Sequence, residues 1–201
     1  MNGMLSSLIK VAIKNLKVIV KSERKRLLNK DSILLVLDMQ EKILMPIANK
    51  DMIINNIKKI IDSCKILNYN VYVTEQYPEK LGKTIDFDIR YKSFSKRAFS
   101  CCQCKELIKE LKFKNVNSIM ICGIETHICI LQSCLDLIDA GFQIYLLSDA
   151  VGSRNSNDHE MALMRMVAEG IKISTVEAAI FEMCKTSENV NFKNISEIIK
   201  R

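Results

Sequence analysis

The feature that most constrains this chain is an unbroken apolar run at residues 33–37 (ILLVL), which ends at an acidic residue, Asp38. Five apolar side chains in a row indicate a strand buried on both faces, as in parallel sheets. Further short runs predict strands at 71–74, 118–122, 143–147 and 171–175. Apolar residues at helical spacing predict helices near 51–67, 107–113, 128–138, 158–169, 177–183 and 195–199. This alternation predicts an α/β fold with three α/β/α layers and a doubly wound, mostly parallel, Rossmann-like sheet.

A length of 201 residues, 48% of them hydrophobic, suits the core of one domain, which we assign to residues 31–201. Within it, the polar stretch 75–100 contains Pro78 and Gly82 and shows no sustained period. We interpret that stretch as a long loop over the functional site.

The net charge of +7 is concentrated at the N-terminus. Residues 1–30 hold eight Lys or Arg and one acidic residue, Glu23, whereas residues 31–201 hold 22 side chains of each sign. The body of the chain is therefore neutral and lacks the basic field that phosphate backbones require. We predict that nucleic acid is not a partner.

Residues 1–30 predict a basic amphipathic extension, because Lys10, Lys14, Lys17 and Lys21 recur on one stripe of a helix. The lysines interrupt its apolar stretch, so no membrane-spanning segment is expected. Three roles stay open for this segment: binding to a membrane surface, mitochondrial or other organellar targeting, and packing of its apolar side on the domain.

The eight cysteines do not indicate a disulfide framework, since the chain is long for such a domain and shows no signal-peptide pattern. We expect a reducing compartment. The prediction is a cytoplasmic protein, unless residues 1–30 direct it to an organelle.

Two residues with catalytic chemistry fall where doubly wound sheets bind ligands, outside the carboxyl ends of the strands. Asp38 follows the first predicted strand, and Cys129 lies near the start of the helix after the strand at 118–122. The dipole and free N–H groups of a helix N-terminus favour a thiolate, so we expect a lowered thiol pKa and a nucleophilic Cys129.

A series of strings supports this interpretation: VLDMQE (36–41), VTEQYP (73–78), LGKT (81–84), Lys96 with Phe99-Ser100, CGIETHICILQ (122–132), SDAV (148–151) and Ser153-Arg154. In this order and spacing, the sequence resembles the isochorismatase-like hydrolase superfamily, most closely its isochorismatase domain-containing proteins. The resemblance covers roughly residues 31–200. It implies the isochorismatase-like hydrolase fold with strand order 3-2-1-4-5-6.

The resemblance implies a catalytic set of Asp38, Lys96 and Cys129. It also implies a cis peptide bond between Ile124 and Glu125, with the backbone N–H groups of Glu125 and Cys129 as oxyanion contacts. The expected reaction is acyl transfer through a thioester: Asp38 accepts the thiol proton, Lys96 stabilises the charged pair, and Cys129 attacks a carbonyl. A cysteine at this position favours hydrolysis of an amide or related C–N bond.

We expect a small-molecule substrate in a pocket built from Gln40, Gln76, Tyr77 and Phe99, with no cofactor, in a homo-oligomer. We predict no metal, because metal-binding nicotinamidases of this superfamily carry histidines where this chain has residues 74–78 without one.

Other motifs receive simpler interpretations. His127 precedes Cys129 by two residues, which on a helix points the two apart, so a polar pocket or capping role is favoured over a catalytic base. Cys101 and Cys104 form a Cys-x-x-Cys without a second pair, which favours packing at a helix start over redox or zinc chemistry. The run Met161, Met164 and Met166 is interpreted as core.

One alternative from another class stays open, a catalytically silent interaction protein that retains the hydrolase fold. The feature that separates the two is the presence of all three candidate catalytic residues. A binding protein has no need for the complete set.

Overall fold

The computed structural model describes residues 31–88 and 91–201, so the predicted N-terminal extension lies outside the described residues. One six-stranded sheet forms its centre, and every pairing in it is parallel. The strands are β1 (Ser32–Leu37), β2 (Asn70–Gln76), β3 (Lys92–Lys96), β4 (Ser118–Ile124), β5 (Gln143–Gly152) and β6 (Lys172–Ser174). Their order, β3-β2-β1-β4-β5-β6, is the order that the resemblance implied.

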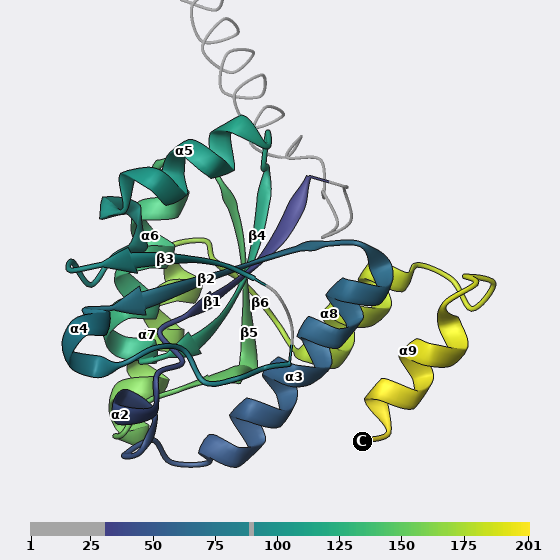
Figure 1. Cartoon of the computed structure of the whole chain (residues 1–201), viewed down its shortest axis with the longest axis horizontal. Helices are drawn as coiled ribbons and strands as arrows, with labels where there is room; N and C mark the ends of the chain where they lie inside the picture. The colour runs from purple at the N-terminus through teal and green to yellow at the C-terminus, as the bar shows by residue number, and fades with distance from the viewer. Residues whose placement is uncertain (1–30, 89–90) are drawn as a thin grey trace, which may run out of the picture.

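The helices cover both faces of this sheet (Figure 1). They are α2 (Glu41–Leu44), α3 (Lys50–Leu67), α4 (Pro78–Leu81), α5 (Lys105–Phe113), α6 (Leu131–Asp139), α7 (Ser156–Ala168), α8 (Val176–Cys184) and α9 (Phe192–Ile199), with a 3₁₀ turn η1 (Cys101–Gln103) and a π-helical turn η2 (Thr126–Ile130). The buried side of α3, α8 and α9 packs on one face, and that of α5, α6 and α7 on the other. The predicted three-layer α/β/α architecture is confirmed.

The central strand β1 shows why this sheet forms. All six of its residues are buried, with Leu34 and Val36 in the core under α3 and Leu35 and Leu37 in the core under α5 and α6. Successive strand residues point to opposite faces, so a continuous apolar run is what a sheet covered on both sides requires.

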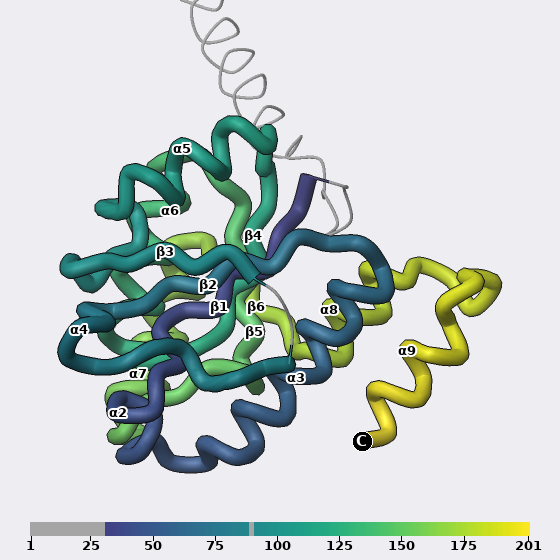
Figure 2. The backbone as a smooth tube through the Cα atoms, viewed as in Figure 1, coloured from purple at the N-terminus to yellow at the C-terminus, as the bar shows by residue number. Residues whose placement is uncertain are grey.

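The stretch 75–100 is more ordered than the sequence predicted. Strand β2 continues to Gln76, the short helix α4 follows, and β3 pairs with β2 at the edge of the sheet. Figure 2 shows the chain running from α4 across toward α3 before it returns to β3. The strand escaped prediction because, of its sequence KSFSK, only Phe94 and Lys96 are buried.

Two packing predictions have different outcomes. Cys101 and Cys104 are buried in the core beside α5, which confirms their packing role at a helix start. The prediction that the methionine run is core is wrong for two of three residues: Met161 and Met164 are exposed and only Met166 is buried. Helix α7 therefore carries an apolar outer side.

A close approach between β1 and β4 sets the geometry of the site. Gly123 pairs with Leu37 and has φ of +119°, and a Cβ atom there would lie 2.1 Å from the carbonyl oxygen of Leu37. Only glycine fits that position. The glycine lets the two strands whose ends carry Asp38 and the turn η2 stay in contact.

Candidate active site

Three elements bring the candidate catalytic residues together at the carboxyl ends of the strands. Asp38 directly follows β1, Lys96 is the last residue of β3, and Cys129 lies in the turn η2 after β4. Lys96 thus comes from the edge strand that the sequence did not predict, whereas Asp38 and Cys129 follow two central strands.

The Lys96 ammonium is enclosed by oxygen atoms. Its Nζ lies 2.7 Å from Oδ2 of Asp38, and both side chains are 1% exposed. Nζ also donates to Oε1 of Gln76 at 2.6 Å and to the carbonyl oxygens of Phe99 at 2.9 Å and Ala98 at 3.4 Å. One carboxylate oxygen and three neutral oxygens thus surround the Lys96 amine in a buried site.

The two oxygens of Asp38 have different surroundings. Oδ1 accepts a hydrogen bond from the Thr74 hydroxyl at 2.7 Å. Oδ2 accepts no hydrogen bond of good geometry from the described residues, although the Lys96 ammonium lies beside it. A buried carboxylate oxygen with an unused lone pair can receive a proton.

Cys129 lies against this pair, with its Sγ 3.5 Å from Nζ of Lys96. Burial raises the pKa of its thiol to about 12, and the Asp38 carboxylate adds to the rise while the Lys96 ammonium opposes it. The prediction of a lowered pKa is therefore wrong for this arrangement. The thiol is protonated at neutral pH, and its activation requires a nearby base.

The turn that carries Cys129 differs from the regular helix start that the sequence predicted. Residues Thr126–Ile130 form one π-helical turn, in which the N–H of Ile130 donates to the carbonyl oxygen of Glu125. The peptide bond between Ile124 and Glu125 is cis, as the resemblance implied. Such single π turns are frequent at functional sites.

Gln40 has a different position from the pocket that the sequence predicted. Its side chain is completely buried and bonds the backbone of Gln76, accepting from the N–H at 2.7 Å and donating to the carbonyl at 3.0 Å. It also donates to the carbonyl oxygen of Gly82. Gln40 thus fixes the end of β2, where Gln76 contacts Lys96.

A cavity of about 300 Å³ opens beside the Cys129 thiol. Of the predicted pocket residues, Gln76 and Phe99 line it, whereas Gln40 and Tyr77 do not; the Tyr77 ring lies 3.5 Å from the guanidinium carbon of Arg97. Its other lining residues are Lys42, Ile43, Pro46, Leu81, Ile124, Glu125, Ile128 and Arg154. The sequence analysis missed the lining from α2 and Arg154, because no periodicity shows which loop side chains face a cavity.

Both histidines link the turn η2 to neighbouring segments, since His127 lies in the turn itself and His159 lies on α7. His127 Nδ1 lies 3.0 Å from the Ser153 hydroxyl, and His159 Nδ1 lies 2.9 Å from the Thr126 hydroxyl. Burial lowers the pKa of His159. Neither histidine lines the cavity. Among residues 31–88 and 91–201, no group of three or more His, Cys, Asp or Glu is arranged to hold a metal ion.

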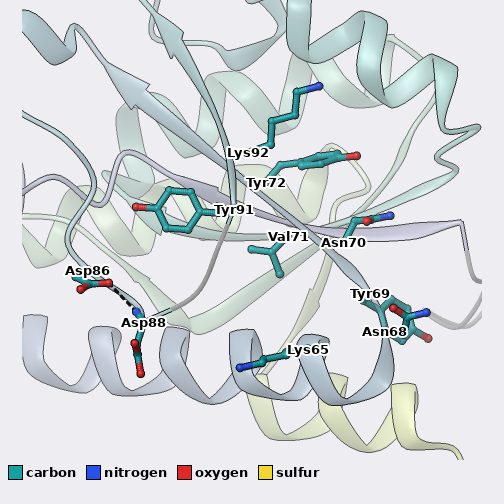
Figure 3. Close-up of a pocket in the computed structure, with 10 residues that line it drawn as sticks. All are labelled: Lys65, Asn68, Tyr69, Asn70, Val71, Tyr72, Asp86, Asp88, Tyr91 and Lys92. Atoms are coloured by element: carbon teal, nitrogen blue, oxygen red, sulfur yellow. Dashed lines mark hydrogen bonds between the residues drawn. The ribbon is translucent and has the colours of Figure 1, made fainter.

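A broader hollow of about 1070 Å³ lies at the other end of the sheet, around the amino ends of β2 and β3. Figure 3 shows Tyr72 and Lys92 pointing to one side of these strands and Val71 to the other. No cysteine or histidine is among its described lining residues. It therefore offers no thiol or imidazole, and the smaller cavity beside Cys129 is the candidate active site.

Comparison with known proteins decides the family. Residues 32–178 match the family described as Isochorismatase domain. The chain belongs to the isochorismatase family. Isochorismatase family protein 1A of Dictyostelium discoideum is 37% identical over 173 residues, which cover 82% of this chain and 84% of that protein. Isochorismatase domain-containing protein 2A of Mus musculus is 35% identical and covers 87% of this chain and 85% of its own.

A solved structure of the family has the same fold. The structure named MAR1 ribonuclease from Caenorhabditis elegans superposes with a TM-score of 0.83 at 32% identity and covers 88% of this chain and 93% of its own. The six-stranded parallel sheet and its helical layers are thus those of isochorismatase-like hydrolases.

Proposed function

We propose that this protein is a cysteine hydrolase that cleaves an amide or related C–N bond of a small molecule. The observation that carries the proposal is the buried contact of Lys96 with both Asp38 and Cys129, at 2.7 Å and 3.5 Å. Placing three such groups together without solvent is costly unless they act on each other.

The first step is the attack of Cys129 on the substrate carbonyl. Oδ2 of Asp38 takes the thiol proton as the S–C bond forms, and the Lys96 ammonium offsets the negative charge that moves onto sulfur. Backbone N–H groups of Glu125 and Cys129 are proposed to stabilise the oxyanion. Asp38 then gives the proton to the leaving amine as the C–N bond breaks.

The second step releases the acyl group. Asp38 takes a proton from water, the water oxygen bonds to the thioester carbon, and the S–C bond breaks with return of the proton to sulfur. Amide and water thereby become carboxylic acid and amine, and Cys129 is restored. The raised pKa of Cys129 suits this cycle, because the sulfur takes back its proton at the end and the thiol is uncharged between turnovers.

The test is covalent trapping. Iodoacetamide should label Cys129 in the intact protein, and Cys129→Ala should lose both this label and hydrolysis of a panel of small amides. Cys184→Ala is a suitable control, since Cys184 is also buried but lies on α8, away from the site. Equal, slow labelling of all eight cysteines would instead favour a catalytically silent interaction protein.

RNA hydrolysis is a rival activity, because three similar solved structures carry the name ribonuclease or putative ribonuclease. The balanced charge of residues 31–201 and the cavity of about 300 Å³ favour a small molecule over a polynucleotide. Release of nucleotides from RNA by the intact protein but not by Cys129→Ala would overturn our proposal.

The helices of residues 31–88 and 91–201 include none with the length and hydrophobicity of a membrane-spanning segment.

We also propose that the protein forms a homo-oligomer through the outer side of α7, where Met161, Met164 and Val167 are 49%, 65% and 56% exposed. An apolar helix side of this kind is typical of association surfaces. Light scattering should show a mass above 23.0 kDa that falls toward this value in Met164→Glu.

A further inference from the structure

We propose that the substrate is a small amide that carries a carboxylate at the end of an apolar spacer, and that Arg154 and Lys42 bind this carboxylate. The inference rests on the proposed function, since it concerns the same cavity. It adds the charge, the size and the polarity of the molecule that the cavity accepts.

The dimensions of the cavity set the size of the substrate. At about 30 Å³ per non-hydrogen atom, a cavity of about 300 Å³ holds roughly ten such atoms. Its walls between the thiol and the opening are mostly apolar, with Ile43, Leu81, Phe99, Ile124 and Ile128 among them. A short hydrocarbon spacer matches such walls.

Arg154 is held in a way that leaves its binding edge free. The buried carboxylate of Glu125 accepts from the Arg154 backbone N–H at 3.1 Å and lies 3.7 Å from its Nε. The terminal guanidinium nitrogens have no hydrogen-bond partner among the described residues, and the side chain is 59% exposed at the cavity. With Nε on the side of Glu125, the terminal nitrogens present two parallel N–H groups, which is the geometry that carboxylates prefer.

Lys42 gives the cavity a net positive charge. Its Nζ donates to the carbonyl oxygen of Lys80 at 2.7 Å, a neutral partner that leaves the charge uncompensated. Of the lining residues, Lys42 and Arg154 are cationic and Glu125 is anionic, while the Asp38 and Lys96 charges behind them cancel. An anionic group on the substrate is therefore attracted, and a cationic one is repelled.

Hydrolysis of such a substrate requires no reactant other than water. In a monoamide of a short dicarboxylic acid, Cys129 bonds to the amide carbon, ammonia leaves with the thiol proton, and water then releases the second carboxylate. The first carboxylate is unchanged throughout and serves for binding.

The experiment compares two alkylating reagents that differ in charge. Iodoacetate and iodoacetamide are applied to the full chain, and the rate at Cys129 is read by peptide mass spectrometry, with glutathione as the free-thiol reference. We expect the iodoacetate-to-iodoacetamide ratio at Cys129 to exceed that of glutathione by about tenfold or more, given the usual strength of a charged hydrogen bond. High salt should reduce this excess.

Arg154→Gln should lower the ratio strongly, Arg154→Lys and Lys42→Gln less so, and Arg154→Glu should bring it below the glutathione value. Arg165→Gln is the matched control, because this exposed arginine on α7 lies outside the cavity and should leave the ratio unchanged. With substrates, succinamate should be hydrolysed faster than 4-oxopentanamide, its neutral counterpart of equal size.

The outcomes separate the two proposals. If Cys129 reacts with neither reagent, the cysteine hydrolase itself is wrong and the inference falls with it. If Cys129 reacts with both in the glutathione ratio, or if Arg154→Gln leaves a high ratio unchanged, the hydrolase stands and the carboxylate-binding role is wrong.

Discussion

Lys96 Nζ and Asp38 Oδ2 lie 2.7 Å apart, although Lys96 belongs to an edge strand and Asp38 to the end of the central strand β1. The pair spans the width of β2, whose residues Thr74 and Gln76 contact one partner each. Removal of either partner leaves a buried charge uncompensated, which is costly.

Asp38→Asn should have opposite effects on turnover and on thiol acidity. Loss of the proton acceptor should lower kcat by about 10² to 10⁴. Because the Asp38 carboxylate raises the pKa of Cys129, the substitution should lower that pKa. Steady-state kinetics and the pH dependence of alkylation measure the two effects. A variant that keeps full turnover would contradict the role of Asp38.

Lys96→Met should move the thiol pKa in the other direction. The ammonium lowers the pKa of Cys129, so its loss should raise a value that is already about 12. In the unmodified protein, alkylation through the thiolate should rise with pH without a plateau below about pH 11, and the variant should be slower at each pH. An alkylation profile with a plateau near pH 8 in either protein would contradict this.

Gln76→Leu should mainly affect turnover, whereas Gln40→Leu should mainly affect the stability of the fold. Gln76→Leu removes an acceptor from the Lys96 ammonium and should lower kcat by about 10- to 100-fold. Gln40→Leu leaves two backbone groups of Gln76 unpaired and should lower the free energy of unfolding by about 2 kcal/mol, as measured by urea titration. Gln103→Leu, an exposed position in η1, is the control and should change neither value.

Gly123→Ala should lower the free energy of unfolding by at least about 3 kcal/mol, since a Cβ there meets the Leu37 carbonyl at 2.1 Å. Gly141→Ala is the matched control. Gly141 also has positive φ, at +92°, but no atom lies within 4 Å of its added Cβ, so only the backbone strain of about 1 kcal/mol applies. Equal losses in the two variants would show that the close approach of β1 and β4 is unimportant.

Deletion of residues 1–30 should leave Cys129 alkylation within about threefold of the full chain. The family match begins at residue 32, and the site residues all lie beyond it. Circular dichroism of the shortened chain provides the folding control. Failure of the shortened chain to fold would show that the segment packs as part of the core.

The sequence predicted the central strands because a strand buried on both faces is apolar throughout, as in β1. Their order was implied by the resemblance alone. The sequence could not predict β3, because an edge strand with one buried aromatic residue has no such pattern. The polarity of a residue also did not show where its side chain points. Gln40 and Gln76 are both amides near strand ends, yet one bonds backbone groups and the other lines the cavity.

The chemistry of the site was only partly predictable. Spacing and resemblance identified Asp38, Lys96 and Cys129, which the fold brings together. The acidity of Cys129 depends on burial and on the distance to Asp38, and both are properties of the folded chain. The cavity lining depends on where α2 and the residues after β5 place Lys42 and Arg154, which no local pattern encodes.

The position of Lys96 on β3 makes the proposed catalytic arrangement less durable than the fold. Asp38 and the turn with Cys129 follow strands flanked on both sides, whereas β3 is hydrogen-bonded to β2 alone. Edge strands open at lower free energy than central ones. Fraying of the five residues of β3 withdraws the ammonium and leaves a buried carboxylate beside an inert thiol, while the other five strands stay paired. Such a protein can spend part of its lifetime folded and inactive, and whatever stabilises this edge will raise the active fraction without touching a reacting atom.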